Sequence, residues 1–140
     1  MDLHRSYAER FGISAQELES TNLAPTAYAY TRHLLEAAHS GGLPEVAAVL
    51  MPCQWGYAEL GAMLEREGDV TDANPYADWI KTYSAEDFQE IARWLCGLLD
   101  DLAGGLSNVR KKSLSEIFLT SSRYEYLFWD MSYRLENWPV

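Results

Sequence analysis

The chain has 140 residues, 48% of them hydrophobic, and we expect residues 1–140 to form a single domain. The formal net charge of −10 argues against a nucleic-acid partner, because phosphate binding requires clustered Lys and Arg. There is no apolar run of about 18 residues, so the sequence predicts no membrane span. The two cysteines, Cys53 and Cys96, form no CxxC pair and no signal segment is apparent, which favours the reducing cytoplasm.

Helical periodicity and capping residues mark the first part of the chain. Apolar residues at four-residue spacing within 3–11 predict a short helix that ends at Gly12. Residues Ser14–Glu17 have the pattern of a capping box and predict the start of a second helix. Pro25 suits the first turn of a third helix, which we expect to end at Gly41-Gly42.

The remainder of the chain is also predicted to be helical. The apolar segment from Val46 to about Leu64 predicts a helix that Pro52 kinks by removing a backbone hydrogen bond. Further helices are expected from Asn74-Pro75 through Ile80, from the capping residues Ser84–Asp87 to Gly104-Gly105, and from about Ser113 through Tyr133. In the second of these, the residues expected to face inward are Phe88, Ile91, Leu95, Leu98, Leu99 and Leu102. No segment alternates as a strand does, so we predict an all-α bundle of about five to seven helices.

Cys53 is the first candidate catalytic residue. It follows Pro52 directly, and the Tyr57 hydroxyl lies one helical turn further on the same side of the helix. A cysteine that meets a substrate is a good nucleophile, whereas a buried cysteine is more often a small hydrophobic residue, and the sequence alone leaves both interpretations open. Cys96 lies in a leucine-rich helix and is predicted to be a core residue.

Glu125 is the second candidate, because it stands among Tyr124, Tyr126 and Phe128. A carboxylate in such surroundings suits a general acid or base. The alternatives are an exposed glutamate, or one paired with Arg123 or Arg134.

Tyrosines and histidines give weaker signals. Four tyrosines could stack on a planar ligand and offer it hydroxyl groups, although tyrosines with wet tips in an amphipathic core are more common; they are Tyr28, Tyr30, Tyr57 and Tyr83. The three histidines have no spacing typical of metal ligands, so no metal site is predicted.

Four segments in order resemble the TenA/thiaminase II family. They are Pro25–Thr31, Leu50–Tyr57, Trp79–Tyr83 and Ser121–Trp129. Each alone is a weak signal, but together they cover nearly the whole chain and make the match specific. The resemblance implies the haem-oxygenase-like helical fold, without haem or another cofactor.

The resemblance also implies a site and a reaction. Cys53 matches the family's nucleophile, and Glu125 matches the carboxylate that moves protons on the substrate. Pocket residues are matched by Tyr30, Tyr57, Tyr83 and Phe128. The implied reaction is hydrolysis of 4-amino-5-aminomethyl-2-methylpyrimidine to the hydroxymethyl pyrimidine in thiamine salvage, with slower cleavage of thiamine itself.

Compared with the family, the chain is expected to be shortened at its N-terminus. Family members carry helices before the segment that resembles Leu3–Tyr7, and these helices supply an aspartate that binds the pyrimidine. We therefore expect a homo-oligomer, or another chain, to cover the apolar surface that is left. Two alternatives to an enzyme remain at this point: a non-catalytic remnant that binds a small molecule or a protein, and a purely structural bundle.

Overall fold

The computed structural model describes residues 2–140, and within this range it contains seven helices and no strands. The helices are α1 (Asp2–Arg10), α2 (Ala15–Ser20), α3 (Pro25–Ser40), α4 (Leu43–Arg66), α5 (Ala77–Ser84), α6 (Glu86–Gly104) and α7 (Asn108–Arg134). The predicted all-α class is confirmed.

Several helix ends are formed by the residues that predicted them. The Ser14 hydroxyl accepts a hydrogen bond from the backbone N–H of Glu17, and the Glu17 carboxylate accepts one from the N–H of Ser14, which completes the capping box of α2. Pro25 is the first residue of α3. A backbone N–H at this position has no acceptor within the helix, so the N–H that proline lacks costs no helical hydrogen bond. Gly12 follows α1 at a φ of 79°, a conformation that favours glycine.

Three details differ from the prediction. Helix α7 begins at Asn108 instead of near Ser113, because the Ser107 hydroxyl caps it by accepting from the N–H of Arg110. Helix α5 begins only at Ala77, after a turn through residues 74–76. Ile91 is 51% exposed and does not face inward, since the buried residues of α6 are Ala92 and Leu95.

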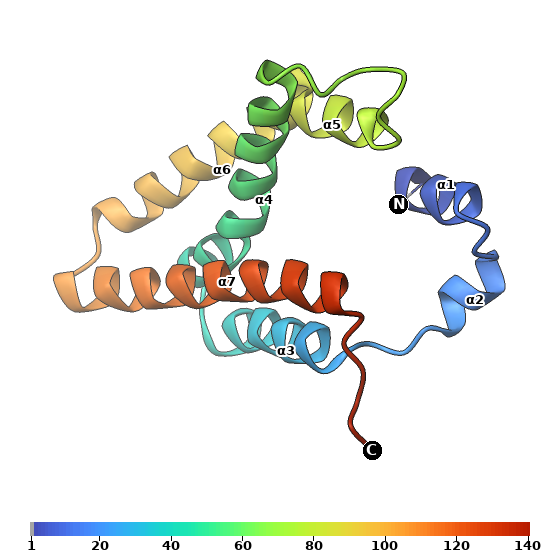
Figure 1. Cartoon of the computed structure of the whole chain (residues 1–140). Helices are drawn as coiled ribbons and strands as arrows, with labels where there is room; N and C mark the ends of the chain where they lie inside the picture. Colours follow the sequence, from blue (N-terminus) through green and yellow to red (C-terminus); the bar gives the residue numbers. More distant parts are fainter. Residues whose placement is uncertain (1) are drawn as a thin grey trace.

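Helix α4 is the centre of the bundle and contacts α3, α5, α6 and α7. In Figure 1, α3 runs alongside α7 while α4 crosses them steeply. The core between α4 and α6 contains Ala47, Met51 and Leu95, with Phe118 of α7 packed against it. This packing fixes the position of α4 relative to α7, and therefore the position of Cys53 on α4 relative to Glu125 on α7.

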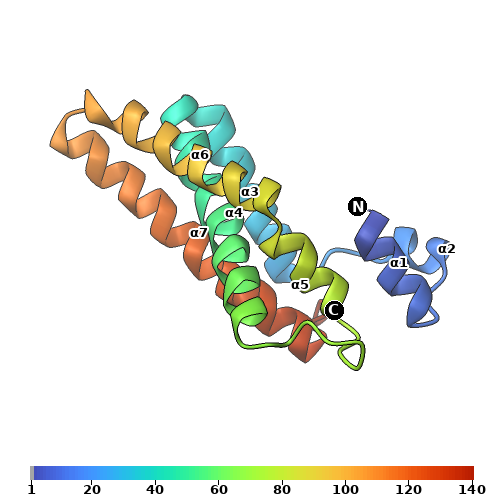
Figure 2. The ribbon, with the colours of Figure 1, turned by 90° about the horizontal axis from the view of Figure 1, so that it is seen from above.

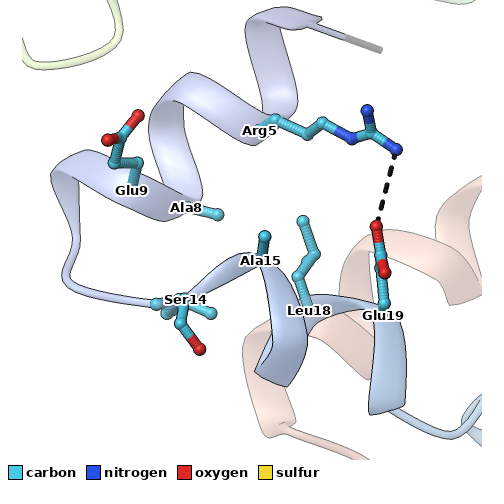
Figure 3. A pocket seen from close by; sticks show the side chains of 8 residues that line it. Arg5, Ala8, Glu9, Ser14, Ala15, Leu18 and Glu19 are labelled. Carbon is cyan, nitrogen blue, oxygen red and sulfur yellow. Dashed lines mark ion pairs between the residues drawn. The ribbon is translucent and has the colours of Figure 1, made fainter.

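Helices α1 and α2 lie to one side of the other five in the described part of the chain (Figure 2). The Tyr7 hydroxyl accepts a hydrogen bond of 2.9 Å from the backbone N–H of Trp79, so α1 is tied to the start of α5. Helices α1 and α2 contact each other and enclose a hollow of about 290 Å³. Arg5 of α1 and Glu19 of α2 form an exposed ion pair of 3.9 Å across it (Figure 3). No helix among residues 2–140 is both long and apolar enough to cross a membrane.

Candidate active site

A cavity of about 450 Å³ opens beside Cys53. Its walls come from α1, α4, α5, α6 and α7, and the lining residues are His4, Cys53, Gln54, Tyr57, Trp79, Tyr83, Phe88, Phe128 and Trp129. The volume lies in the range of small-molecule sites, which are concave and mostly apolar with a few polar groups. Four of the six residues expected from the sequence, Cys53, Tyr57, Tyr83 and Phe128, line this one cavity. It shares no residue with the hollow of Figure 3.

The other two expected residues, Tyr30 and Glu125, form a pair next to the cavity. The Tyr30 hydroxyl donates a short hydrogen bond of 2.5 Å to Oε1 of Glu125. Tyr30 is only 8% exposed, so this bond is largely shielded from water. The Glu125 charge contributes to the raised pKa of the Cys53 thiol and of the Tyr57 hydroxyl.

Helical spacing explains why these side chains converge. Cys53 and Tyr57 are four residues apart on α4, and Glu125 and Phe128 are three apart on α7, so each pair lies on one side of its helix. Tyr83 is the penultimate residue of α5, and the Gln89 amide donates 2.9 Å hydrogen bonds to the carbonyl oxygens of both Tyr83 and Ala58.

Helix α5 comes close to α4 at Gly61. A Cβ atom at this position would lie 2.6 Å from the carbonyl carbon of Tyr83, which is too close for any side chain. Glycine therefore permits the approach that brings the Tyr83 ring to within 5.1 Å of the Tyr57 ring, measured between centroids.

Aromatic rings form most of the cavity wall. The rings of Trp79 and Tyr83 have centroids 4.4 Å apart, and those of Tyr57 and Trp129 have centroids 5.8 Å apart. Trp79 and Trp129 were not among the site residues expected from the sequence. A signal for them was present, because Trp79 precedes Tyr83 by four residues and Trp129 follows Glu125 by four. Flat rings of this kind suit a planar heterocycle.

The Cys53 thiol and the phenols of the site are held in their neutral forms. Burial, followed by the charge of Glu125 and hydrogen bonding to it, raises the pKa of the Cys53 thiol to about 11, although the residue remains accessible from the cavity. Burial is also the main cause that raises the pKa of Tyr30, Tyr57 and Tyr83. At neutral pH the thiol and the phenols therefore keep their protons and can donate them.

The surroundings of three residues bear on the interpretations that the sequence left open. Cys53 is not a buried hydrophobic residue, since it is exposed at the cavity. Glu125 accepts from Tyr30, while Arg134 pairs with Asp130 at 2.9 Å. Cys96 is half-buried and packs against the α4–α6 core, as expected. Among residues 2–140, no three His, Cys, Asp or Glu side chains come together as metal ligands would.

A helical bundle with a cysteine and an aromatic wall around one cavity, and a glutamate next to it, is typical of a small-molecule enzyme. The model of the TENA/THI-4/PQQC family matches residues 1–135, and the chain belongs to this family. Its helices have the haem-oxygenase-like arrangement of the family's solved structures.

Known relatives give the family match its detail. The chain is 46% identical to an aminopyrimidine aminohydrolase of Halalkalibacterium halodurans, across 99% of this chain and 62% of that protein. It is 37% identical to an aminopyrimidine aminohydrolase of Bacillus subtilis, across 99% of this chain and 58% of that protein. A TenA-family protein of Silicibacter sp. TM1040, described as a transcription regulator, superposes with a TM-score of 0.83 at 38% identity, across 94% of this chain and 60% of that one.

The chain thus spans about three fifths of the length of these relatives.

Proposed function

We propose that the chain carries the catalytic residues of an aminopyrimidine hydrolase, which converts 4-amino-5-aminomethyl-2-methylpyrimidine and water into the hydroxymethyl pyrimidine and ammonia. The observation that supports this most is the grouping of Cys53, Glu125 and Tyr30 beside an aromatic cavity. Two relatives that match nearly all of this chain are named aminopyrimidine aminohydrolases. Slower cleavage of thiamine belongs to the same proposal, because thiamine carries the same pyrimidine.

The raised pKa of Cys53 indicates how the reaction begins. The thiol is protonated at neutral pH, so it must lose its proton as its sulfur attacks the electron-poor pyrimidine ring. In this proposal Glu125 takes that proton and passes it to a ring nitrogen, which receives the electron pair displaced by the new C–S bond.

The second half of the reaction releases ammonia. With the aromaticity broken, the ring N–H returns its proton to Glu125, and the electron pair of that nitrogen expels the amine from the exocyclic methylene. Glu125 gives the recovered proton to the amine, which leaves as ammonia. Water then adds to the methylene, its spare proton returns to the carboxylate, and the C–S bond breaks to restore the ring and the thiol. The sum is one C–N bond hydrolysed with no oxidation or reduction.

The aromatic residues bind and orient the ring in this proposal. Tyr57, Tyr83 and Phe128 face the same cavity as the thiol, and the phenols keep their protons as hydrogen-bond donors. Orientation of the reacting ring reduces the entropic cost of the attack.

A further chain completes the working enzyme in this proposal, either as a second copy or as a chain that supplies more helices. Large apolar side chains are left exposed, including Trp94 at 64% and Tyr126 at 71%. A partner would cover such surface. We place the enzyme in the cytoplasm, because both cysteines are free and a nucleophilic thiol must stay reduced.

Ammonia release from the aminomethyl pyrimidine tests the proposed function. The chain should release ammonia, Cys53→Ala should abolish the release, and Cys96→Ala should retain it, because Cys96 lies outside the cavity. Release by Cys53→Ala equal to that of the unaltered chain would reject the nucleophile. Absence of release from all three would reject an autonomous enzyme and leave either a partner-dependent half of an enzyme or a binding remnant.

A further inference from the structure

Helices α3 and α7 are linked by a second polar contact, one helical turn from the bond between Tyr30 and Glu125. Nε2 of His33 lies 3.0 Å from Oγ of Ser121. His33 follows Tyr30 by three residues and Ser121 precedes Glu125 by four, so the two contacts lie on the same sides of their helices. Any movement of α3 along α7 would disturb both contacts.

Ser121 differs from its neighbours on α7. Ser115, Thr120, Ser122 and Ser132 each donate to the carbonyl oxygen four residues earlier, as helical hydroxyls commonly do. Ser121 pairs with His33 from another helix and has no exposed surface. A buried hydroxyl left without a partner is costly, which makes this contact an anchor between the two helices.

The ring of Tyr124 connects the two contacts. It stacks on the Tyr30 ring at a centroid distance of 5.2 Å and an interplanar angle of 8°. It also lies 5.5 Å from the His33 ring. The imidazole therefore limits the position of Tyr124, and Tyr124 limits the plane of the phenol that donates to Glu125.

We propose that His33 and Ser121 are positioning residues, which hold Tyr30 and Glu125 in register so that the carboxylate stays beside Cys53. This inference rests on the proposed function for its catalytic consequence. Neither residue lines the cavity, so both act through Glu125 and not on the substrate.

The test uses the full chain with Ser121→Ala, His33→Phe and the double variant. Ser122→Ala is the matched control, because Ser122 lies on the same helix and donates to Phe118 of that helix. We expect each single variant to lower kcat about tenfold with KM changed by less than about twofold, since a small misplacement of a catalytic group affects mainly the chemical step. The double variant should have about the same kcat as either single variant, because each substitution removes the same contact between His33 and Ser121.

A second readout does not depend on turnover. Alkylation of Cys53 by iodoacetamide at about pH 8, followed by mass spectrometry with Cys96 as internal reference, reports how strongly Glu125 suppresses the thiolate. Displacement of Glu125 lowers the pKa of Cys53, so Ser121→Ala should speed the alkylation about threefold or more, in the direction of Glu125→Gln. His33→Gln keeps a hydrogen-bonding group toward Ser121. Its alkylation rate should therefore be closer to that of the unaltered chain than the rate of His33→Phe.

The outcomes separate the two proposals. Unaltered kcat and alkylation in both Ser121→Ala and His33→Phe would overturn the positioning role, as would a change confined to KM. If the unaltered chain releases no ammonia, it is not an enzyme by itself, and the alkylation rates alone decide whether His33 and Ser121 hold Glu125 in place. If circular dichroism shows that Ser121→Ala does not fold, the kcat values and alkylation rates of His33→Phe and His33→Gln are compared instead. Equal values in these two variants and the unaltered chain would overturn the positioning role.

Discussion

Glu125 is the side chain through which Tyr30 and Cys53 influence each other. Its carboxylate accepts the Tyr30 hydroxyl at 2.5 Å, and its charge is the second cause, after burial, of the raised pKa of Cys53. The same contact that orients the carboxylate thus favours the protonated thiol. The proposed attack depends on this arrangement, because it supplies both the proton and the group that receives it.

Replacement of Tyr30 by Phe tests the orientation of Glu125. The variant removes the hydroxyl and keeps the ring that stacks on Tyr124, so the carboxylate loses a donor and can rotate. We expect kcat for ammonia release to fall about tenfold or more with a small change in KM. Tyr28→Phe is the matched control, since Tyr28 is 46% exposed and contacts Trp138 instead; an equal fall in both variants would contradict the interpretation.

The pH dependence of Cys53 alkylation tests the electrostatics. Burial and the Glu125 charge disfavour the thiolate. The alkylation rate should therefore rise with pH through a midpoint at about pH 11, above the ordinary thiol pKa of 9.0. Glu125→Gln removes the charge and leaves the burial, so the midpoint should move down without reaching 9.0. A midpoint unchanged by Glu125→Gln would show that the carboxylate does not act on the thiol.

At the scale of helices, two glycines of α4 have different roles. Gly61 lies under α5, where an added Cβ would come within 2.6 Å of the Tyr83 backbone, while a Cβ at Gly56 would meet nothing within 4 Å. The contact at Gly61 sets the distance between α4 and α5, and therefore the position of Tyr83 in the cavity.

Gly61→Ala should lower the free energy of unfolding by about 1–3 kcal/mol, because α5 must move away from α4. Gly56→Ala on the same helix should raise it by about 0.5–1 kcal/mol, since alanine favours the helix and has room. Urea denaturation measures both. Equal effects of the two substitutions would mean that the close approach of α5 does not constrain the fold.

The helix predictions succeeded where the information is local. The capping box at Ser14 and the proline at Pro25 act within a few residues of the chain, so their pattern is legible in the sequence. Two other features depend on how whole helices pack. One is the exposure of Ile91, and the other is the hydrogen bond between Tyr30 and Glu125, two residues that are 95 positions apart in the chain. Periodicity does not contain that information. Five of the six site residues were candidates from the residues themselves, whereas Phe128 was named only through the family resemblance. The resemblance also gave the residues their roles, and these roles stay predictions.

At the scale of the whole molecule, α1 is attached to the bundle through few contacts. The Tyr7 hydroxyl accepts from the N–H of Trp79, and Arg10 pairs with Asp78 at 3.3 Å on the surface. Trp79 also lines the Cys53 cavity, as does His4 of α1. The attachment of α1 therefore shapes one side of the site.

Tyr7→Phe should lower the free energy of unfolding by about 1 kcal/mol, because it leaves an N–H in the first turn of α5 without its acceptor. Tyr133→Phe is the control, since Tyr133 is 91% exposed and its hydroxyl has no such contact in the described residues. Thermal unfolding of both variants gives the comparison. An equal shift in melting temperature would contradict the anchoring role of Tyr7.

Protection of Cys53 by the hydroxymethyl pyrimidine product tests most directly whether this cavity is an aminopyrimidine site. The chain is treated with iodoacetamide with and without the product, and the two cysteines are followed separately by mass spectrometry. We expect saturating product to slow the alkylation of Cys53 about tenfold or more and to leave the alkylation of Cys96, which packs against the core, unchanged. Equal alkylation of Cys53 in both samples would mean that the pyrimidine does not bind beside the thiol, and the central claim would be wrong.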